Sequence, residues 1–323
     1  MATIAVVGAG GIGTAIAGLL ARSGTDVVLV GRSPAHVDAI TTDGLRIDLP
    51  DGRSWHTPLE ATVHPASAGP CDHVIVATKA FDTAAAARTA EPLVGPGTWV
   101  TTVQNGLGND AVLAASFGSE RVLPGLTTIG AERRAPGVVY VSDSTARGAS
   151  VTHVGPPRAP GGTLEGARAL AAHMDAAGLP VSPTDAIDQE IWKKLALAVM
   201  GPVSALLGAT VGATWEEQPA RGLVERLHDE VVAVAHAAGV PVDREASWAH
   251  AVATFEGTGH HYTSMATDII QGRQVEIGAI TGSVVDLAGR LGVDVPAASA
   301  VVALVLLTQQ VGVRRIGAAP AEA

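Results

Sequence analysis

The stretch MATIAVVGAGGIGTAIAGLLARSGTDVVLVGR, residues 1–32, contains the pattern on which the rest of the fold depends. Residues 3–7 are a short apolar run, partly β-branched, which is typical of a buried strand. Residues 14–23 predict a helix that Gly24 ends, and residues 27–30 predict a second buried strand. A strand, a helix and a strand in this order indicate the first βαβ unit of a parallel sheet.

Three glycines, Gly8, Gly10 and Gly13, stand between the first strand and the helix at the G-x-G-x-x-G spacing of a dinucleotide-binding loop. The first glycine permits the tight turn, the second lets the backbone approach a pyrophosphate, and the third lets the helix pack closely on the strand. The N–H groups of the helix N-terminus attract the phosphates. A glycine-rich turn without a ligand is the alternative. The expected cofactor contacts in this loop are Gly8, Ala9, Gly10, Gly11, Ile12 and Gly13.

The end of the second strand predicts which dinucleotide binds. NAD sites place an Asp or Glu there to accept from the ribose hydroxyls, but this strand ends in Gly31-Arg32-Ser33. The Arg32 guanidinium can form a bidentate pair with a 2′-phosphate, and Ser33 can add a hydrogen bond. We therefore expect NADP(H) rather than NAD(H). A solvated surface arginine is the alternative.

Composition limits the other classes of function. The 323 residues are 47% hydrophobic and only 3% aromatic, so two domains with cores of Ala, Val and Leu are expected. The net charge of −10, without any run of Lys or Arg, argues against nucleic acid or an anionic membrane surface as partner. No metal is expected.

Cellular location is predicted from the single cysteine and from the absence of a leader-like segment. Cys71 cannot form a disulfide within the chain, which fits the reducing cytoplasm, and we expect it to be a small buried hydrophobe. Residues 1–7 read as strand rather than as a basic leader, and the apolar residues 297–307 are too few to span a bilayer.

The rest of the chain predicts an α/β fold with a doubly wound, mostly parallel sheet, followed by helices. Further strands are expected at 44–49, 53–55, 71–78, 98–103, 122–123, 127–131, 138–141, 150–154 and 181–184, with hairpins around Pro50-Asp51-Gly52 and between 138–141 and 150–154. Helices are expected at 34–41, 82–90, 109–117, 164–177, 185–207 (interrupted at Gly201-Pro202), 219–238, 244–255, 276–291 and 297–311. Residues 1–184 are thus expected to be an NADP(H)-binding Rossmann-type domain, and residues 185–323 an all-helical substrate and dimerisation domain.

Polar residues follow three of the predicted strands: Arg32, Lys79 and Asn105. In doubly wound sheets, ligands bind outside the carboxyl ends of the strands, so we expect these side chains at the cofactor. Asn105 offers both a donor and an acceptor, which suits the junction of nicotinamide and substrate. A turn residue in Asn-Gly is the alternative.

A candidate general acid, Lys194, lies on the first helix of the second domain. Ala198 and Gly201 follow at spacings of four and three and share its face, whereas Lys193 points about 100° away. A lysine whose pKa is lowered by burial can protonate a developing alkoxide. A solvated helix lysine is the alternative.

Six segments together resemble one known family: GAGGIG at 8–13, Arg32, TKA at 78–80, QNGLG at 104–108, IWKKLA at 191–196 and SMATDIIQGRQVEIG at 264–278. Over nearly its whole length the chain resembles the ketopantoate reductases (2-dehydropantoate 2-reductases) of pantothenate biosynthesis. The resemblance implies that the glycine loop and Arg32 bind NADPH and that Lys79 contacts the cofactor side of the cleft. It also implies that Asn105 bridges cofactor and substrate and that Lys194 is the general acid.

The same resemblance places Ser264 and Glu276 in the substrate and active-site shell, with Glu276 also near the cofactor. For Ser264 the alternative is a helix N-cap. For Glu276 the alternative is a surface ion pair with Arg273, three residues earlier. Asp268 is expected to be structural.

One departure from the family affects the substrate. After the acid lysine the family places two Asn residues that face the substrate, where this chain has Ala198 and Gly201. Loss of polar partners weakens recognition of a hydroxyl, so we expect a roomier, more apolar site. His261, beside His260 and shortly before Ser264, is a candidate replacement contact; a solvated loop histidine is the alternative.

The favoured function is NADPH-dependent reduction of a 2-oxo acid or related ketone that is bulkier or more apolar than ketopantoate. A true 2-dehydropantoate 2-reductase is the alternative within enzymes. A non-catalytic NADP(H)-binding sensor or scaffold is the alternative from another class. The apolar helices of the second domain also suggest a homodimer.

Overall fold

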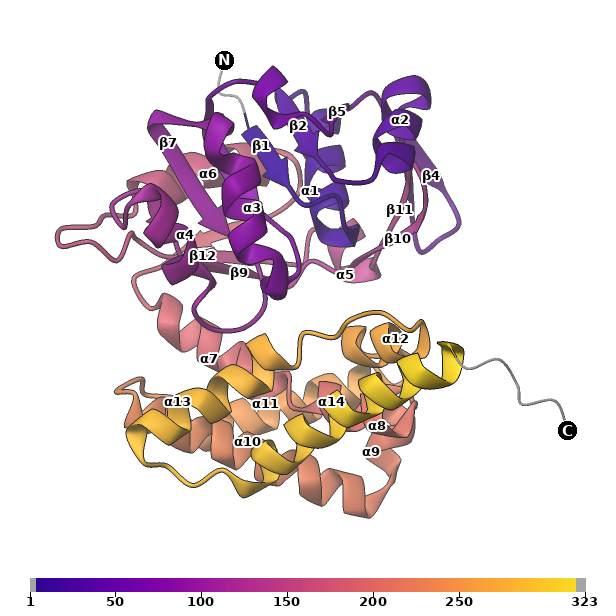
Figure 1. The fold of residues 1–323 in the computed structure, drawn as a ribbon, viewed down its shortest axis with the longest axis vertical. Helices are drawn as coiled ribbons and strands as arrows, with labels where there is room; N and C mark the ends of the chain where they lie inside the picture. Colours follow the sequence, from indigo (N-terminus) through magenta and orange to yellow (C-terminus); the bar gives the residue numbers. More distant parts are fainter. Residues whose placement is uncertain (1–3, 318–323) are drawn as a thin grey trace, which may run out of the picture. The chain divides into compact units, whose positions relative to one another are not determined.

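The computed structural model describes residues 4–317, and the side chains of residues 4–311. The chain forms two compact units that divide after Ile187, one of strands and helices and one of helices alone (Figure 1). The domain boundary predicted after residue 184 lies three residues before this division. Ile187 belongs to the first unit because its side chain packs on Gly155, where a Cβ would lie 2.4 Å from Ile187 Cγ2.

The first unit is built on a six-stranded sheet in which every paired strand is parallel, as predicted for a doubly wound fold. Val7 lies opposite both Val30 and Val76, and Val76 lies opposite Thr102. The carboxyl ends of four strands therefore form one row. In spatial order the strands are β5 (Glu60–Thr62), β2 (Val27–Val30), β1 (Ile4–Val7), β6 (Cys71–Val76), β7 (Val94–Thr102) and β8 (Val122–Leu123).

Helices cover both faces of this sheet (Figure 1). Because side chains alternate along a strand, Ile4 and Val6 pack toward α1 (Gly11–Arg22) and α6 (Glu165–Ala176). Ala5 and Val7 pack toward α3 (Thr83–Ala90) and α4 (Asn109–Phe117). Burial on both faces explains the nearly continuous apolar runs of these strands.

Two smaller sheets complete the first unit, together with α2 (Pro34–Asp43) and α5 (Asp143–Ala146). One has the order β10 (Ala131–Ala135), β11 (Val138–Val141), β3 (Leu45–Asp48) and β4 (Ser54–Thr57), and the other β13 (Val181–Pro183), β12 (Thr152–Val154) and β9 (Gly125–Thr127). The antiparallel β3–β4 hairpin confirms the turn predicted around Pro50-Asp51-Gly52.

Two strand predictions in this part of the chain were wrong. The expected strand 127–131 is split between β9 and β10, and Thr127 Oγ1 accepts from the N–H of Ile129 at the bend. The expected hairpin of 138–141 with 150–154 does not form, since β11 pairs with β10 and β3 instead. Ser142 caps α5 between the two segments, and this helix turns the chain away.

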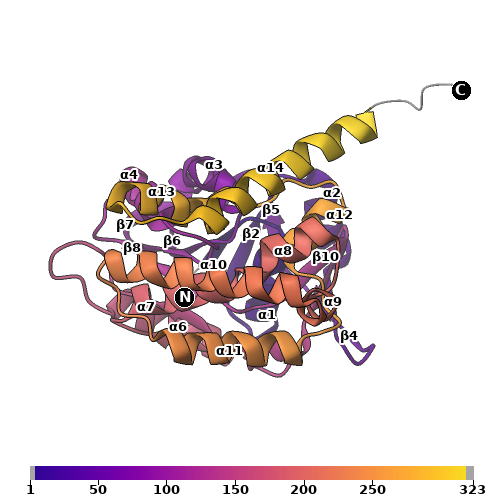
Figure 2. The same ribbon diagram turned by 90° about the horizontal axis from the view of Figure 1, so that it is seen from below.

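The second unit packs its helices around α10 (Gln218–Ala237). Figure 2 shows α10 between α11 (Arg244–Gly257) and the pair α13 (Ser283–Leu291) and α14 (Pro296–Gly317), and α10 contacts all three. The remaining helices are α7 (Ile187–Leu197), α8 (Met200–Leu207), α9 (Val211–Glu216) and α12 (Ser264–Ile270).

The interruption of the first long helix lies earlier than predicted. It falls at Ala198 and Val199, between α7 and α8, whereas Gly201 and Pro202 lie in the first turn of α8. Proline has no N–H for the carbonyl four residues before it and crowds that carbonyl. The Ala198 carbonyl instead accepts from the N–H of Gly201, at 2.9 Å, which tightens the turn.

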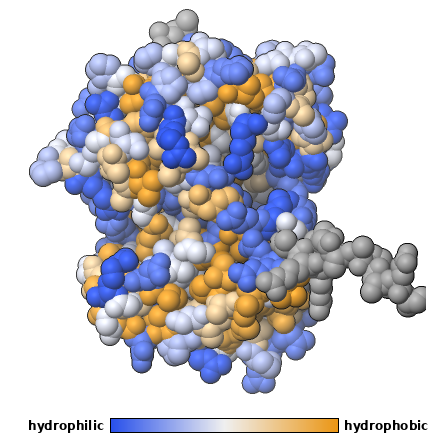
Figure 3. All heavy atoms as spheres, in the orientation of Figure 1, coloured by the Kyte–Doolittle hydropathy of each residue, from blue (hydrophilic) through white to orange (hydrophobic). Residues whose placement is uncertain are grey.

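Apolar side chains are exposed along α14, and Figure 3 shows hydrophobic surface on the second unit. Leu304, Leu307 and Val311 are each between 44% and 54% exposed and repeat at helical spacing. The predicted homodimer stays a prediction. Within the described part of the chain, no helix has both the length and the apolar character needed to cross a bilayer.

Candidate active site

The glycine loop between β1 and α1 has the shape that close approach of a phosphate requires. Gly8 has φ +116°, and a Cβ there would lie 2.7 Å from the N atom of Thr78. A Cβ on Gly13 would lie 2.0 Å from the Gly8 carbonyl oxygen, so only glycine lets α1 pack this closely. A Cβ on Gly10 would meet nothing within 4 Å. Gly10 is also the N-cap of α1 and has no side chain to accept from the first N–H groups, which leaves them available to an anion.

The three predicted strand-end residues lie at one edge of the sheet. Arg32, Lys79 and Asn105 follow β2, β6 and β7 by two or three residues, where the strand ends form one row. Arg32 Nη2 lies 3.1 Å from Asp82 Oδ2, and the Arg32 side chain is 84% exposed. Exposed ion pairs contribute little, so this guanidinium can exchange Asp82 for a phosphate.

A buried amide that was assigned no role from the sequence, Gln104, positions this edge. Its Nε2 donates to the backbone carbonyls of Thr78 and Lys79, at 3.1 and 3.3 Å, and its Oε1 accepts from Thr102 Oγ1 at 3.0 Å. Asn109 Nδ2 donates to the Asn105 carbonyl at 2.9 Å. The backbones of Lys79 and Asn105 are therefore each held by a neighbouring amide side chain. Gln104 is part of the QNGLG segment. Its structural role follows from its burial, which only the folded structure shows.

In the second unit, Lys194 is half-buried on α7. Burial lowers the pKa of Lys194 to about 8, and the negative charge of Glu276 opposes this shift. The neighbouring Lys193 is exposed and its Nζ lies 2.8 Å from Glu190 Oε1. The two lysines therefore differ in exposure, as the helical spacing predicts. Lys194 is not a solvated helix lysine.

Glu276 is a buried carboxylate, with 6% of its surface exposed. The burial of Glu276 contradicts the alternative of a surface ion pair. Arg273 binds Asp268, with Nη2 2.7 Å from Oδ1. Asp268 is thus structural, as expected. Glu276 is followed by a π-helical turn, Gly278–Gly282, where the helix 276–291 was predicted to be regular. Such turns are rare in proteins, but those that occur often lie at functional sites.

Ser264 does not cap α12. Thr263 is the N-cap, and its Oγ1 accepts from the N–H of Ala266 at 3.1 Å. The alternative that Ser264 is the helix N-cap was therefore wrong, because the cap is the residue before it. Ser264 is exposed, and its hydroxyl does not cap the helix. The His261 side chain is also exposed, while its carbonyl accepts from the N–H of Val211 at 2.8 Å.

The positions of the missing amides are a half-buried alanine and a glycine that lies beside an apolar side chain. Ala198 is half-buried one turn after Lys194, and its N–H donates to the Lys194 carbonyl at 2.9 Å. A Cβ on Gly201 would lie 3.9 Å from the Cβ of Met265, in ordinary contact. The buried Met265 side chain of α12 therefore lines the space beside Gly201.

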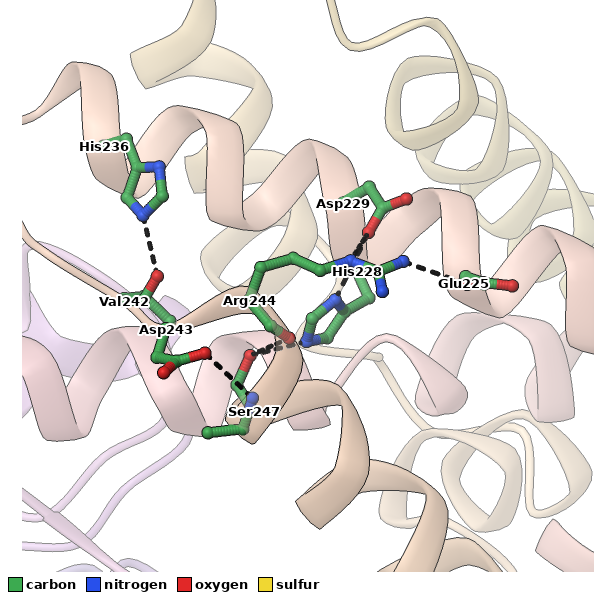
Figure 4. A network of polar contacts seen from close by, with 9 residues as sticks. Glu225, His228, Asp229, His236, Val242, Asp243, Arg244 and Ser247 are labelled. Atoms are coloured by element: carbon green, nitrogen blue, oxygen red, sulfur yellow. Dashed lines mark hydrogen bonds and ion pairs between the residues drawn. The ribbon is translucent and has the colours of Figure 1, made fainter.

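A second polar network, in α10 and α11, combines a serine, a histidine and an aspartate but has no catalytic geometry (Figure 4). His228 Nε2 lies 2.8 Å from Ser247 Oγ, and Ser247 Oγ donates to the Arg244 carbonyl. His228 Nδ1 is 3.7 Å from Asp229 Oδ1, too far for a hydrogen bond, and Asp229 binds Arg244 Nε at 2.8 Å. Without a carboxylate at hydrogen-bonding distance from Nδ1, His228 is not oriented as a base, and the network joins two helices.

Cys71 is buried at the start of β6, and burial raises the pKa of its thiol to about 11. A thiol with so high a pKa is almost entirely protonated at neutral pH and is a poor nucleophile. The prediction of a small buried hydrophobe is confirmed.

A parallel sheet with a G-x-G-x-x-G loop, and a helical unit with a half-buried lysine, define a dinucleotide-dependent reductase. The ketopantoate reductase PanE/ApbA family matches residues 4–155, and the C-terminal domain of that family matches residues 186–309. The chain therefore belongs to the ketopantoate reductase family. It is an oxidoreductase that interconverts C=O and CH–OH groups with a nicotinamide cofactor.

Individual relatives match over nearly their whole length. A 2-dehydropantoate 2-reductase of Halobacterium salinarum is 33% identical over 310 residues, 96% of this chain and 99% of the relative. One from Mesorhizobium japonicum is 34% identical over 322 residues, 94% of this chain and 96% of the relative. The crystal structure of 2-dehydropantoate 2-reductase from Geobacter metallireducens is 30% identical, with a TM-score of 0.87 over 94% of this chain and 99% of that one. A D-mandelate dehydrogenase solved with NADH and anilino(oxo)acetate, 24% identical, shares the fold.

Proposed function

We propose that the protein reduces a 2-oxo acid or related ketone to the hydroxy compound with NADPH, and that Lys194 is the general acid. The burial of Lys194 in a chain of the ketopantoate reductase family carries this proposal. Burial lowers the pKa of Lys194 to about 8, against the opposing effect of the Glu276 charge. A lysine with this pKa is mostly protonated at neutral pH, yet it gives up its proton more readily than an ordinary lysine. It therefore suits protonation of an alkoxide.

Each residue has a separate role in the proposed reduction. NADPH supplies a hydride to the carbonyl carbon when it is bound. The Lys194 ammonium donates a proton to the carbonyl oxygen, so that an alcohol forms and a neutral amine remains. Asn105 orients the carbonyl through its amide, and the Ser264 hydroxyl donates to the substrate carboxylate, with His261 as a further polar contact. Glu276 keeps Lys194 protonated until transfer.

We assign the cofactor as NADP(H) because a positively charged residue, Arg32, follows β2. Arg32 is exposed and held only by a weak surface ion pair, and no carboxylate occupies the ribose position at residues 31–33. Lys79 and the glycine loop contribute the remaining cofactor contacts. Arg32→Asp should exchange NADPH preference for NADH preference, measured as kcat/KM with each cofactor. Equal use of both cofactors by the wild type and by the variant would overturn this assignment.

We propose a substrate with a more apolar side group than ketopantoate. Ala198 and the Met265 side chain beside Gly201 offer hydrocarbon surface where amides would bind a hydroxyl. Ketopantoate itself remains the alternative, supported by relatives that carry the name 2-dehydropantoate 2-reductase. Full-length similarity to 2-dehydropantoate 2-reductases disfavours the hypothesis of a non-catalytic sensor or scaffold.

A substrate panel tests the activity and the substrate class separately. NADPH oxidation would be followed with ketopantoate and with 2-oxo acids whose apolar side groups increase in size. We expect kcat/KM to rise from ketopantoate to the bulkier acids. A maximum at ketopantoate would overturn the substrate class and leave the reductase activity intact, whereas no oxidation with any 2-oxo acid would overturn the activity itself.

A further inference from the structure

Strand β10 lies against the N-terminus of α1, and this contact brings a second arginine to the glycine loop. A Cβ on Gly11 would lie 2.4 Å from the Ala131 carbonyl oxygen, so β10 passes directly over the start of the helix. Two residues further along β10, Arg133 Nη1 lies 3.5 Å from the Ala9 carbonyl oxygen. The side chain of Arg133 is otherwise exposed, and its guanidinium is able to reorient toward a ligand.

The surroundings of Ala9 show which end of the cofactor site Arg133 faces. A Cβ on Gly31 would lie 2.7 Å from Ala9 Cβ, so Ala9 is packed against the end of β2, one residue before Arg32. Burial, and secondarily the charge of Arg133, lower the pKa of His36 to about 4. His36 lies in the first turn of α2, which begins at the end of β2. Arg133 is therefore near the two elements that would flank an adenosine ribose.

We propose that Arg133 is a second guanidinium for the 2′-phosphate of NADP(H), acting together with Arg32 from a different element of the first unit. This inference rests on the proposed use of NADPH. The 2′-phosphate carries close to two negative charges at neutral pH, more than one exposed guanidinium can neutralise. A planar guanidinium on each side would bind its oxygens in bidentate fashion, which suits discrimination against NADH.

The adjacent residue offers a matched control. The Arg134 guanidinium has another partner, because it lies 3.9 Å from the centre of the Tyr140 ring. Its charge also helps to lower the pKa of Asp48. Arg134→Ala removes the same charge from the same strand without removing a cofactor contact.

The test measures dissociation constants of NADPH and NADH by quenching of intrinsic tryptophan fluorescence for the wild type, Arg133→Ala, Arg133→Lys and Arg134→Ala. We expect Arg133→Ala to weaken NADPH binding by about 10- to 100-fold and NADH binding by less than about threefold. Arg133→Lys should recover part of the NADPH affinity, because it keeps the charge but not the bidentate geometry. Arg134→Ala should bind both cofactors like the wild type.

Three results would overturn the proposal. Equal weakening of NADPH and NADH by a folded Arg133→Ala variant would place the guanidinium at the pyrophosphate. Unchanged NADPH affinity would show that Arg133 makes no contact with the cofactor. A wild type that prefers NADH would overturn the proposed cofactor and this contact together, so failure of the parent proposal is recognised from the wild type alone.

Discussion

The pH dependence of turnover tests the role of Lys194 most quantitatively. In the proposed role Lys194 acts as an acid, so only its protonated form would be active, and the rate would fall as the pH rises through its pKa. With a pKa of about 8, about nine-tenths of the enzyme is protonated near pH 7 and about one-tenth near pH 9. We therefore expect kcat to fall about tenfold over that interval, measured as NADPH oxidation at saturating substrate.

Three variants make this profile specific to Lys194. Glu276→Gln removes the negative charge that raises the pKa of Lys194, so the alkaline limb should move to lower pH. Lys193→Gln alters an exposed lysine paired with Glu190 and should leave the profile where it was. Lys194→Met should reduce kcat by about 100-fold or more, the usual contribution of a general acid, while NADPH still binds.

The reasoning would be refuted by an alkaline limb near 10.5, the ordinary pKa of a lysine. It would also be refuted if the limb stayed in place in Glu276→Gln, because the carboxylate would then have no influence on the acid. A Lys194→Met variant with wild-type turnover would remove this residue from the chemistry.

Three further substitutions have defined outcomes. Ala198→Asn should raise kcat/KM for ketopantoate relative to bulkier 2-oxo acids by about tenfold, by restoring an amide beside the acid; an unchanged ratio would contradict this. Gln104→Leu leaves buried donors and acceptors unpaired, so urea unfolding should show a loss of about 2–4 kcal/mol together with a lower kcat. Gly13→Ala places a Cβ 2.0 Å from the Gly8 carbonyl oxygen and should cost about 1–3 kcal/mol and weaken NADPH binding. Wild-type stability in either of the last two variants would contradict the packing that the structure shows.

The sequence was informative where a local pattern determines the structure. The G-x-G-x-x-G spacing predicted a tight turn at Gly8 and close packing at Gly13, and the structure has φ +116° at Gly8 and no room for a Cβ at Gly13. Approach of a pyrophosphate at Gly10 stays a prediction. The helical spacing of Lys193 and Lys194 separated an exposed lysine from a half-buried one. These inferences need only the geometry of one turn or one helix.

The sequence was misleading where the outcome depends on distant partners. The partner of β11 is set by the packing of β3 and β10, so the expected hairpin with residues 150–154 was wrong. Arg133 is more than one hundred residues from Ala9 in the chain, and only the folded contact of β10 with α1 brings them together. Long-range pairing of this kind leaves no local pattern to read.

The central claim is that the chain catalyses hydride transfer to the carbonyl carbon of a 2-oxo acid. Its most direct test uses NADPH deuterated at the transferable C4 position, with a bulky apolar 2-oxo acid and mass spectrometry of the product. We predict a 2-hydroxy acid that carries deuterium on C2, formed by the wild type and strongly reduced in Lys194→Met. A product without deuterium, or no product from any 2-oxo acid in the presence of bound NADPH, would contradict the account.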